Sequence, residues 1–147
     1  MGSTIKPEKL DLDILLVEDD AIDAILFFRF SDSFLRYRPH TTHVRNIDSA
    51  LDALENKTFD VCFLDFWLNG QSSLKFLVDL ECRNIRAPTV ILSNISPHQV
   101  ETLRMTSGGA IFLNKGDCSA KTLEAAVEDA LALARVSHGD VQRARVA

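Results

Sequence analysis

The sequence predicts an α/β fold in which a parallel β-sheet is covered by helices on both faces. Five short runs alternate along the chain with five longer stretches whose apolar residues recur at helical spacing. This alternation is typical of strand–helix–strand units, which form parallel sheets. Most of the short runs are apolar throughout, as strands are when both faces of a sheet are buried. We therefore expect a doubly wound five-stranded sheet.

The strands and helices are expected in strict order along the chain. Branched and aromatic residues mark most of the strands, and the run at 43–46 is the weakest of the five. The expected strands are 14–17, 43–46, 61–64, 89–92 and 110–113. Helical spacing of apolar residues marks the stretches between them. The expected helices are 20–35, 48–56, 72–82, one between Ser96 and Gly108, and 119–136.

Local signals support two of these helices in particular. The fourth helix has Ser96 as its cap and Pro97 in its first turn, where a missing N–H is harmless. Gly108 and Gly109 end that helix. The first helix carries an apolar stripe at every fourth position, which is expected to face the sheet. The stripe is formed by Ile22, Leu26, Phe30 and Phe34.

The length of 147 residues suits a single domain. We expect this domain at 12–136, between an N-terminal extension at 1–11 and a polar, flexible C-terminal tail at 137–147. The formal net charge of −5 argues against a protein that coats nucleic acid, and no apolar run is long enough for membrane insertion. Three cysteines without a pairing pattern favour reduced thiols, and no signal peptide is visible. A cytoplasmic protein is therefore predicted.

Polar residues with complementary chemistry follow four of the five expected strands. Glu18 and Asp19 follow the first strand, Asp65 the third, Ser93 the fourth and Lys115 the fifth. Ligands of doubly wound sheets bind outside the carboxyl ends of the strands, so these side chains are expected to meet. Clustered carboxylates repel one another unless a cation lies among them, and hard oxygen ligands suit Mg²⁺. The sequence therefore predicts a Mg²⁺ site at this edge.

Four segments resemble the signature segments of response-regulator receiver domains in two-component signalling. They are LLVEDD at 15–20, VCFLD at 61–65, VILS at 90–93 and GAIFLNK at 109–115. They occur in the family's order, and the likeness covers about residues 12 to 136. An acidic cluster alone would suit the N-terminus of a helix equally well. The resemblance implies a stand-alone receiver domain with a (βα)5 flavodoxin-like fold and strand order 2-1-3-4-5.

The resemblance also implies a role for each residue at this edge. Asp65 would be the phosphoacceptor, and Ser93 and Lys115 would hold the phosphoryl oxygens. Ser93 and Phe112 would form a switch that responds to phosphorylation through a population shift. The Mg²⁺ ligands would be Glu18, Asp19, Asp65 and the backbone carbonyl of Trp67.

The implied partner is a sensor histidine kinase or a histidine phosphotransfer protein that carries a phosphohistidine. The chain would then be no enzyme in the usual sense, since it would catalyse only its own phosphorylation and slow dephosphorylation. Its downstream partner is open, a homodimer is one arrangement to consider, and no nucleic-acid partner is expected. On the first helix, Ile25, Phe27 and Phe28 lie outside the predicted stripe. They predict either a docking surface for a partner or tighter packing against a neighbouring helix.

Three other functions fit part of the pattern. A degenerate receiver would bind partners without phosphorylation, and the family's common proline is replaced here by Gly116 while Asn94 follows Ser93. A flavin-binding protein of the same architecture would need a phosphate-binding loop rich in Ser, Thr and Gly after the first strand, where this chain has three acids. A DNA-binding regulator would need a further domain, for which the residues after 136 are too few. The complete set of acids, hydroxyl and lysine favours the phosphoacceptor.

Overall fold

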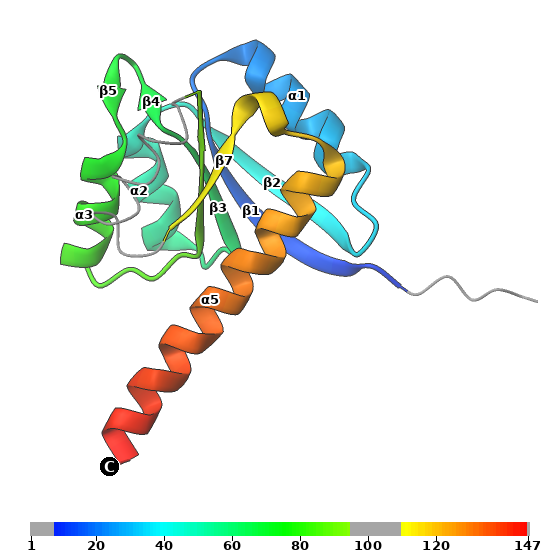
Figure 1. Cartoon of the computed structure of the whole chain (residues 1–147). Coiled ribbons are helices and arrows are strands. Elements are labelled where there is room, and N and C mark those ends of the chain that lie inside the picture. Colours follow the sequence, from blue (N-terminus) through cyan, green and yellow to red (C-terminus); the bar gives the residue numbers. More distant parts are fainter. Residues whose placement is uncertain (1–7, 95–109, 147) are drawn as a thin grey trace, which may run out of the picture.

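The computed structural model describes residues 8–94 and 110–146, with side chains described as far as residue 136. Its centre is a five-stranded sheet in which every neighbouring pair of strands is parallel (Figure 1). The spatial order is β2-β1-β3-β6-β7, which confirms the predicted order 2-1-3-4-5. The strands are β1 Leu10–Val17, β2 Tyr37–Val44, β3 Val61–Asp65, β6 Thr89–Ser93 and β7 Ile111–Asn114.

Helices cover both faces of the sheet, as predicted (Figure 1). The helices are α1 Ala21–Asp32, α2 Ile47–Asn56, α3 Leu74–Cys82 and α5 Ala120–Val146, with a short 3₁₀ helix η1 at Lys115–Asp117. Side chains alternate along β1, because successive residues of a strand point to opposite faces. Ile14 and Leu16 pack with α1 and α5, whereas Leu15 and Val17 pack with α2 and α3. The fold therefore has two apolar layers, one on each side of the sheet.

The second strand differs from its prediction. It covers Tyr37–Val44 instead of 43–46, and β1 begins four residues earlier than predicted. The two strands pair in register over their whole length, from Leu10 opposite Tyr37 to Val17 opposite Val44. Because β2 is at the edge of the sheet, most of its side chains are at least partly exposed and can be polar. An apolar run is therefore a poor guide to this strand.

The structure confirms only part of the stripe predicted for the first helix, since Phe34 is buried and Phe30 packs partly buried against the core. Ile22 is 70% exposed and Leu26 is 40% exposed, so neither packs fully against the sheet. The buried positions of this segment are Ala24, Phe27, Ser31 and Phe34. Large apolar residues occur on several sides of this helix, which is why spacing alone placed Ile22 and Leu26 inward and missed Phe27. Tertiary packing placed Phe27 inward, where its ring lies 4.8 Å from that of Phe63 between centroids.

A short hairpin after β3 was not predicted. It consists of β4 Trp67–Leu68 and β5 Gln71–Ser72, which pair antiparallel. The connecting residues Asn69 and Gly70 have φ values of 51° and 77°. Both positions of a two-residue type I′ turn need positive φ, and Asn-Gly is the preferred pair there. The dipeptide was the signal in the sequence for this turn.

Two predicted segments need separate mention. The helix expected between Ser96 and Gly108 lies outside the described residues. The last helix, predicted at 119–136, has helical backbone through Val146, and its final turns extend away from the body of the molecule (Figure 1). Within the described ranges, no helix is both long and apolar enough to cross a membrane.

Candidate functional site

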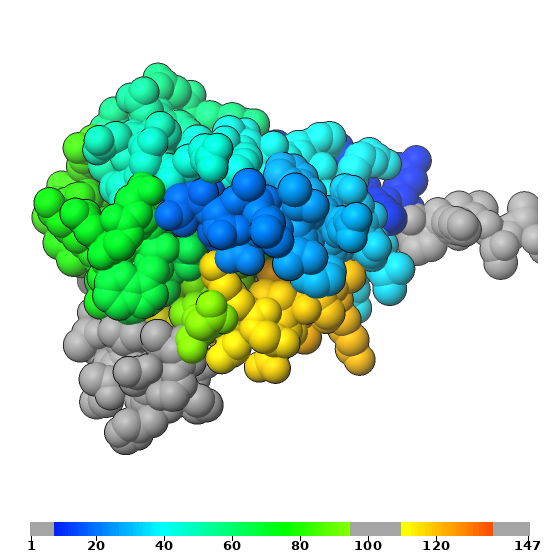
Figure 2. Space-filling view, turned by 90° about the horizontal axis from the view of Figure 1, so that it is seen from above, coloured from blue at the N-terminus to red at the C-terminus, as the bar shows by residue number. Residues whose placement is uncertain are grey.

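The carboxyl ends of the strands bring the predicted site residues together. Glu18 and Asp19 follow β1, Asp65 ends β3, Ser93 ends β6 and Lys115 follows β7. Figure 2 views this end of the molecule: the blue start of α1 lies against the green segment after β3, and the yellow segment after β7 lies beside both. The parallel sheet therefore produces the convergence that its topology predicts.

Three carboxylates form a compact acidic cluster. Ligand oxygens of Glu18, Asp19 and Asp65 all lie within 4.8 Å of one another. Glu18 is 2% exposed and Asp65 is 7% exposed. Burial, and then the charge of Asp65, raises the pKa of Glu18 to about 7. Burial also raises the pKa of Asp65, against the opposing effect of Lys115. The fold thus disfavours ionisation of these carboxyl groups, and a bound cation would stabilise their ionised forms.

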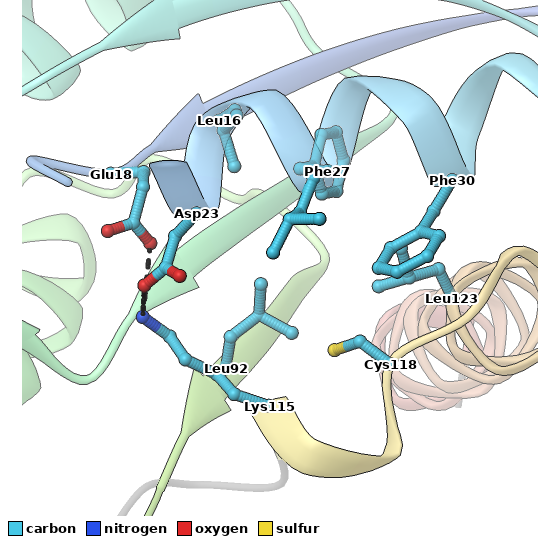
Figure 3. A pocket seen from close by; sticks show the side chains of 10 residues that line it. Leu16, Glu18, Asp23, Phe27, Phe30, Leu92, Lys115, Cys118 and Leu123 are labelled. Atoms are coloured by element: carbon cyan, nitrogen blue, oxygen red, sulfur yellow. Dashed lines mark hydrogen bonds and ion pairs between the residues drawn. The ribbon is translucent and has the colours of Figure 1, made fainter. Parts of the chain in front are cut away.

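Lys115 reaches into this cluster from the start of η1. Its Nζ lies 3.3 Å from Asp65 Oδ1, 3.4 Å from Glu18 Oε2 and 2.7 Å from Asp23 Oδ2. In Figure 3, dashed lines join the ammonium group to the carboxylates of Asp23 and Glu18. Burial alone would lower the pKa of Lys115, but the surrounding carboxylates outweigh it and raise the pKa. The lysine therefore remains a cation beside the predicted phosphoacceptor.

Asp23 is a member of the site that the sequence analysis missed. It lies in the first turn of α1, one turn after Asp20, and it makes the shortest of the three ion pairs of Lys115. Asp20 is the helix cap, since its Oδ1 accepts from the N–H groups of Ile22 and Asp23 at 2.9 Å each. The spacing of three residues between the cap and Asp23 was the available signal, because it places both on one side of the helix.

The hairpin after β3 closes one side of the cluster. The N–H of Asn69 donates to Asp19 Oδ2 over 3.1 Å, and the N–H of Trp67 donates to Asp65 Oδ1 over 3.4 Å. The Trp67 side chain is 53% exposed and meets Phe66 edge to face, with 5.4 Å between centroids. The only tryptophan of the chain is therefore at the rim of the site.

The two predicted switch residues are both buried. Ser93 is 2% exposed, and its hydroxyl has no hydrogen-bond partner among the residues that the structure describes. A buried hydroxyl without a partner is costly unless a ligand supplies one. Phe112 is 8% exposed and packs in the apolar layer that contains Leu15 and Ile91. Its ring already occupies an inward position.

The predicted docking residues separate into two groups. Ile25 is 57% exposed and Phe28 is 37% exposed, so both are accessible on α1. Phe27 is 4% exposed and belongs to the core, so its prediction as a surface docking residue was wrong. The reason is the phase of α1, which turns Phe27 toward the sheet.

A small pocket lies behind Lys115, between α1 and the segment after β7 (Figure 3). Its volume is about 50 Å³. Its polar part contains Glu18, Asp23 and Lys115. Cys118, with a pKa raised to about 11 mainly by burial, lines its apolar part with Phe30. A neutral thiol of this kind is a weak nucleophile, so the chemistry of the site lies with the carboxylates and the lysine.

Comparisons with known proteins identify the fold. The chain matches no model of a protein family, and no curated protein matches it. Solved structures do match. A Francisella response regulator receiver domain is 22% identical, with a TM-score of 0.68 over 84% of this chain and 98% of that one. The signal receiver domain of a Syntrophus aciditrophicus histidine kinase is 23% identical, with a TM-score of 0.65 over 82% and 90%.

A third neighbour, a two-component response regulator of the LuxR family from Aurantimonas sp., is 18% identical. Its TM-score is 0.70, over 83% of this chain and 86% of that one. At these identities the likeness establishes the architecture, and a shared fold does not by itself transfer a function. The chain therefore has the fold of response-regulator receiver domains, as the sequence predicted.

Proposed function

We propose that this chain is a single-domain response regulator that accepts a phosphoryl group on Asp65. The donor is a phosphohistidine of a sensor histidine kinase or of a histidine phosphotransfer protein. One observation carries the proposal: a buried aspartate at a strand end lies 3.3 Å from a lysine ammonium and within 4.8 Å of two further carboxylates. Charge of both signs around one acceptor suits phosphoryl transfer, which depends on positioning and electrostatics.

The residues of the chain then perform a simple displacement. An oxygen of the Asp65 carboxylate attacks phosphorus, the bond from phosphorus to the imidazole nitrogen of the donor breaks, and the imidazole leaves with the electron pair. Lys115 donates to a phosphoryl oxygen from its place beside Asp65. Ser93, whose hydroxyl has no partner among the described residues, offers a second donor. The product is an acyl phosphate, so the chain acts on itself and not as an enzyme on other substrates.

Mg²⁺ fits the carboxylates that the structure brings together. Glu18, Asp19 and Asp65 would hold the ion with hard oxygen ligands, and the backbone carbonyl of Trp67 is the proposed fourth ligand from the protein. When bound, the ion supplies charge neutralisation to the acidic cluster and to the phosphoryl oxygens. The raised pKa of Glu18 supports this assignment, because burial and then the charge of Asp65 disfavour the ionised carboxylate, and a cation would stabilise that form.

Phosphorylation would act on Ser93 and Phe112. A phosphoryl group adds negative charge and three acceptor oxygens, which can take the hydroxyl proton of Ser93 in a hydrogen bond. The Phe112 ring is already buried in this structure. Phosphorylation would therefore tighten the packing of this ring and would not move it from an exposed to a buried position. Ser93→Ala should still take up phosphate but lose coupling to a partner. Normal partner binding by the phosphorylated variant would contradict this role.

The output is proposed to be a protein contact or a phosphorelay in the cytoplasm. Ile25 and Phe28 offer an accessible apolar surface on α1 for docking of the kinase, the phosphotransfer protein or a downstream partner. A homodimer is an additional arrangement that this surface would permit. No nucleic-acid partner is proposed, since the formal net charge is −5.

Fluorescence of Trp67 provides the test. Its backbone N–H contacts Asp65, so we expect a saturable change with Mg²⁺ and a further change with beryllium fluoride, a mimic of the phosphoryl group. Asp65→Asn should abolish the second change. A wild-type protein that responds to neither reagent would contradict the proposal. It would favour the alternative of a binding module that works without phosphorylation.

A further inference from the structure

Two basic side chains, one near the end of β2 and one just after the strand, hold consecutive carbonyl groups of the acidic turn after β1. His43 Nε2 lies 2.8 Å from the carbonyl oxygen of Glu18. Arg45 donates from Nη2 to the carbonyl oxygen of Asp19 over 3.1 Å. The backbone adds a third bond, from the N–H of Glu18 to the carbonyl oxygen of Val44 over 3.0 Å. Three hydrogen bonds therefore connect this turn to the neighbouring strand.

The His43 side chain is held in a defined orientation. A carbonyl oxygen only accepts hydrogen bonds, so Nε2 carries the hydrogen in this contact. The ring of Phe28 on α1 meets the imidazole edge to face, with 6.3 Å between centroids and an interplanar angle of 74°. The imidazole is thus in contact with the acidic turn and with α1 together, and its hydrogen bond has a defined direction.

These bonds act on two of the three residues whose side chains form the acidic cluster. The Glu18 carboxylate reaches Lys115, and the Asp19 carboxylate accepts from the N–H of Asn69. Each residue is therefore held at both ends, by β2 through its carbonyl group and by the opposite wall of the site through its carboxylate. Groups that orient ligands in this way strengthen metal binding, because fewer conformations are lost when the ion arrives.

We infer that His43 and Arg45, here called the β2 clamp, are positioning residues that set the affinity of the acidic cluster for a divalent cation. This inference rests on the proposed function for the identity of the ion. The clamp side chains bond to the carbonyl oxygens of Glu18 and Asp19, whereas the carboxylates would hold the ion. It acts by fixing the backbone from which Glu18 and Asp19 project.

The charge of Arg45 provides an internal test of this role. A cation close to a carboxylate cluster repels Mg²⁺, so its removal strengthens metal binding if charge is its only effect. Loss of a positioning hydrogen bond weakens metal binding instead. The two explanations therefore predict opposite changes for Arg45→Ala. His43→Ala adds a second position at which the hydrogen bond to a carbonyl group is lost.

The chain offers matched controls on the same strand. Arg38 and His40 have the same residue types as the clamp, but they contact the Asp11 carboxylate near the other end of β1, at 3.1 Å and 2.9 Å. Their replacement by Ala removes the same atoms from β2 without touching the acidic turn. A general weakening of β2 would therefore affect both pairs of variants. Loss of the clamp bonds would affect only the His43 and Arg45 variants.

The first experiment is a Mg²⁺ titration of the full chain followed by Trp67 fluorescence. His43→Ala and Arg45→Ala should each raise the Kd about threefold to tenfold, as expected for one lost hydrogen bond. Arg38→Ala and His40→Ala should stay within about twofold of the wild type. His43→Gln and Arg45→Lys keep a donor and should recover most of the affinity. Tighter binding by Arg45→Ala, or equal weakening in the controls, would overturn the inference.

Amide hydrogen exchange without metal is the second experiment. The N–H groups of Glu18 and Asp20 should exchange faster in the clamp variants than in the wild type and the controls, because the turn opens more often. Unchanged exchange rates of these two N–H groups would overturn the inference, whatever the result of the Mg²⁺ titration. A wild-type chain that ignores Mg²⁺ would instead contradict the proposed function, while faster exchange in the variants would still support the clamp as the support of this turn.

Discussion

Replacing Glu18 by Gln should remove a pH-dependent loss of stability from the metal-free protein. The Glu18 carboxyl is almost fully buried, and burial together with the nearby charge of Asp65 raises its pKa from 4.5 to about 7. The folded protein thus holds this proton over a pH range in which the unfolded chain has released it. The ionised form is the one that the fold disfavours.

The sign and size of the effect follow from this difference. Between about pH 4.5 and pH 7 the folded state binds more protons, so the free energy of unfolding falls as pH rises. At about 1.4 kcal/mol per pH unit, the Glu18 contribution lost across this range is about 3 kcal/mol. Asp65 contributes with the same sign, starting at lower pH, because its pKa is also raised. The raised pKa of Lys115 adds no slope, since the lysine is charged in both states throughout this range.

Urea unfolding in the presence of a chelator measures the effect. The free energy of unfolding of the wild type should fall more steeply than that of Glu18→Gln between about pH 5 and pH 7. The two proteins differ only at position 18, so the difference between their pH profiles reports the Glu18 carboxyl and its effect on its neighbours. Glu55→Gln is a matched control, because Glu55 is exposed and pairs with Arg83 on the surface.

Bound Mg²⁺ should change the pH dependence of the wild type. An ion bound to the acidic cluster keeps Glu18 ionised in the folded state, so saturating Mg²⁺ should flatten the pH dependence of the wild type and stabilise it. Glu18→Gln should gain less from the ion. Parallel pH profiles of the wild type and Glu18→Gln without metal would refute the reasoning, since they would mean that the buried carboxyl titrates normally.

Three further predictions concern stability and are measured by urea unfolding. Phe27→Ala should lower the free energy of unfolding by about 3–5 kcal/mol and Ile25→Ser by less than about 0.5, because only the first is buried; similar losses would contradict the phase of α1. Asp20→Ala should cost about 1 kcal/mol through the lost cap, and Asp20→Asn much less. Gly70→Ala should cost about 1 kcal/mol through its positive φ alone, since a Cβ there meets no atom within 4 Å; no loss would argue against the turn.

The sequence alone determined the fold class and much of the candidate site. Buried parallel strands are apolar throughout, so β1, β3, β6 and β7 were recognisable from composition. Once a parallel doubly wound sheet is predicted, its topology brings the carboxyl ends of the strands to one edge. Glu18, Asp65 and Lys115 could therefore be expected to meet although they are far apart in the chain, and the structure places them in contact.

Tertiary structure decided what composition left ambiguous. Helix α1 has large apolar residues on several sides, and only packing against the sheet chose Phe27 over Ile22 as a core residue. The strand β2 is polar because an edge strand is held by backbone pairing with β1, which needs no apolar side chains.

The contacts of Asp23 with Lys115 and of His43 with Glu18 join residues that are adjacent only after folding. A pattern of residues in the sequence indicates which surfaces must be buried and where strands end. It does not indicate which polar groups face each other at those strand ends. That depends on the phase of the helices and the register of the strands, and both are set by packing of the complete chain.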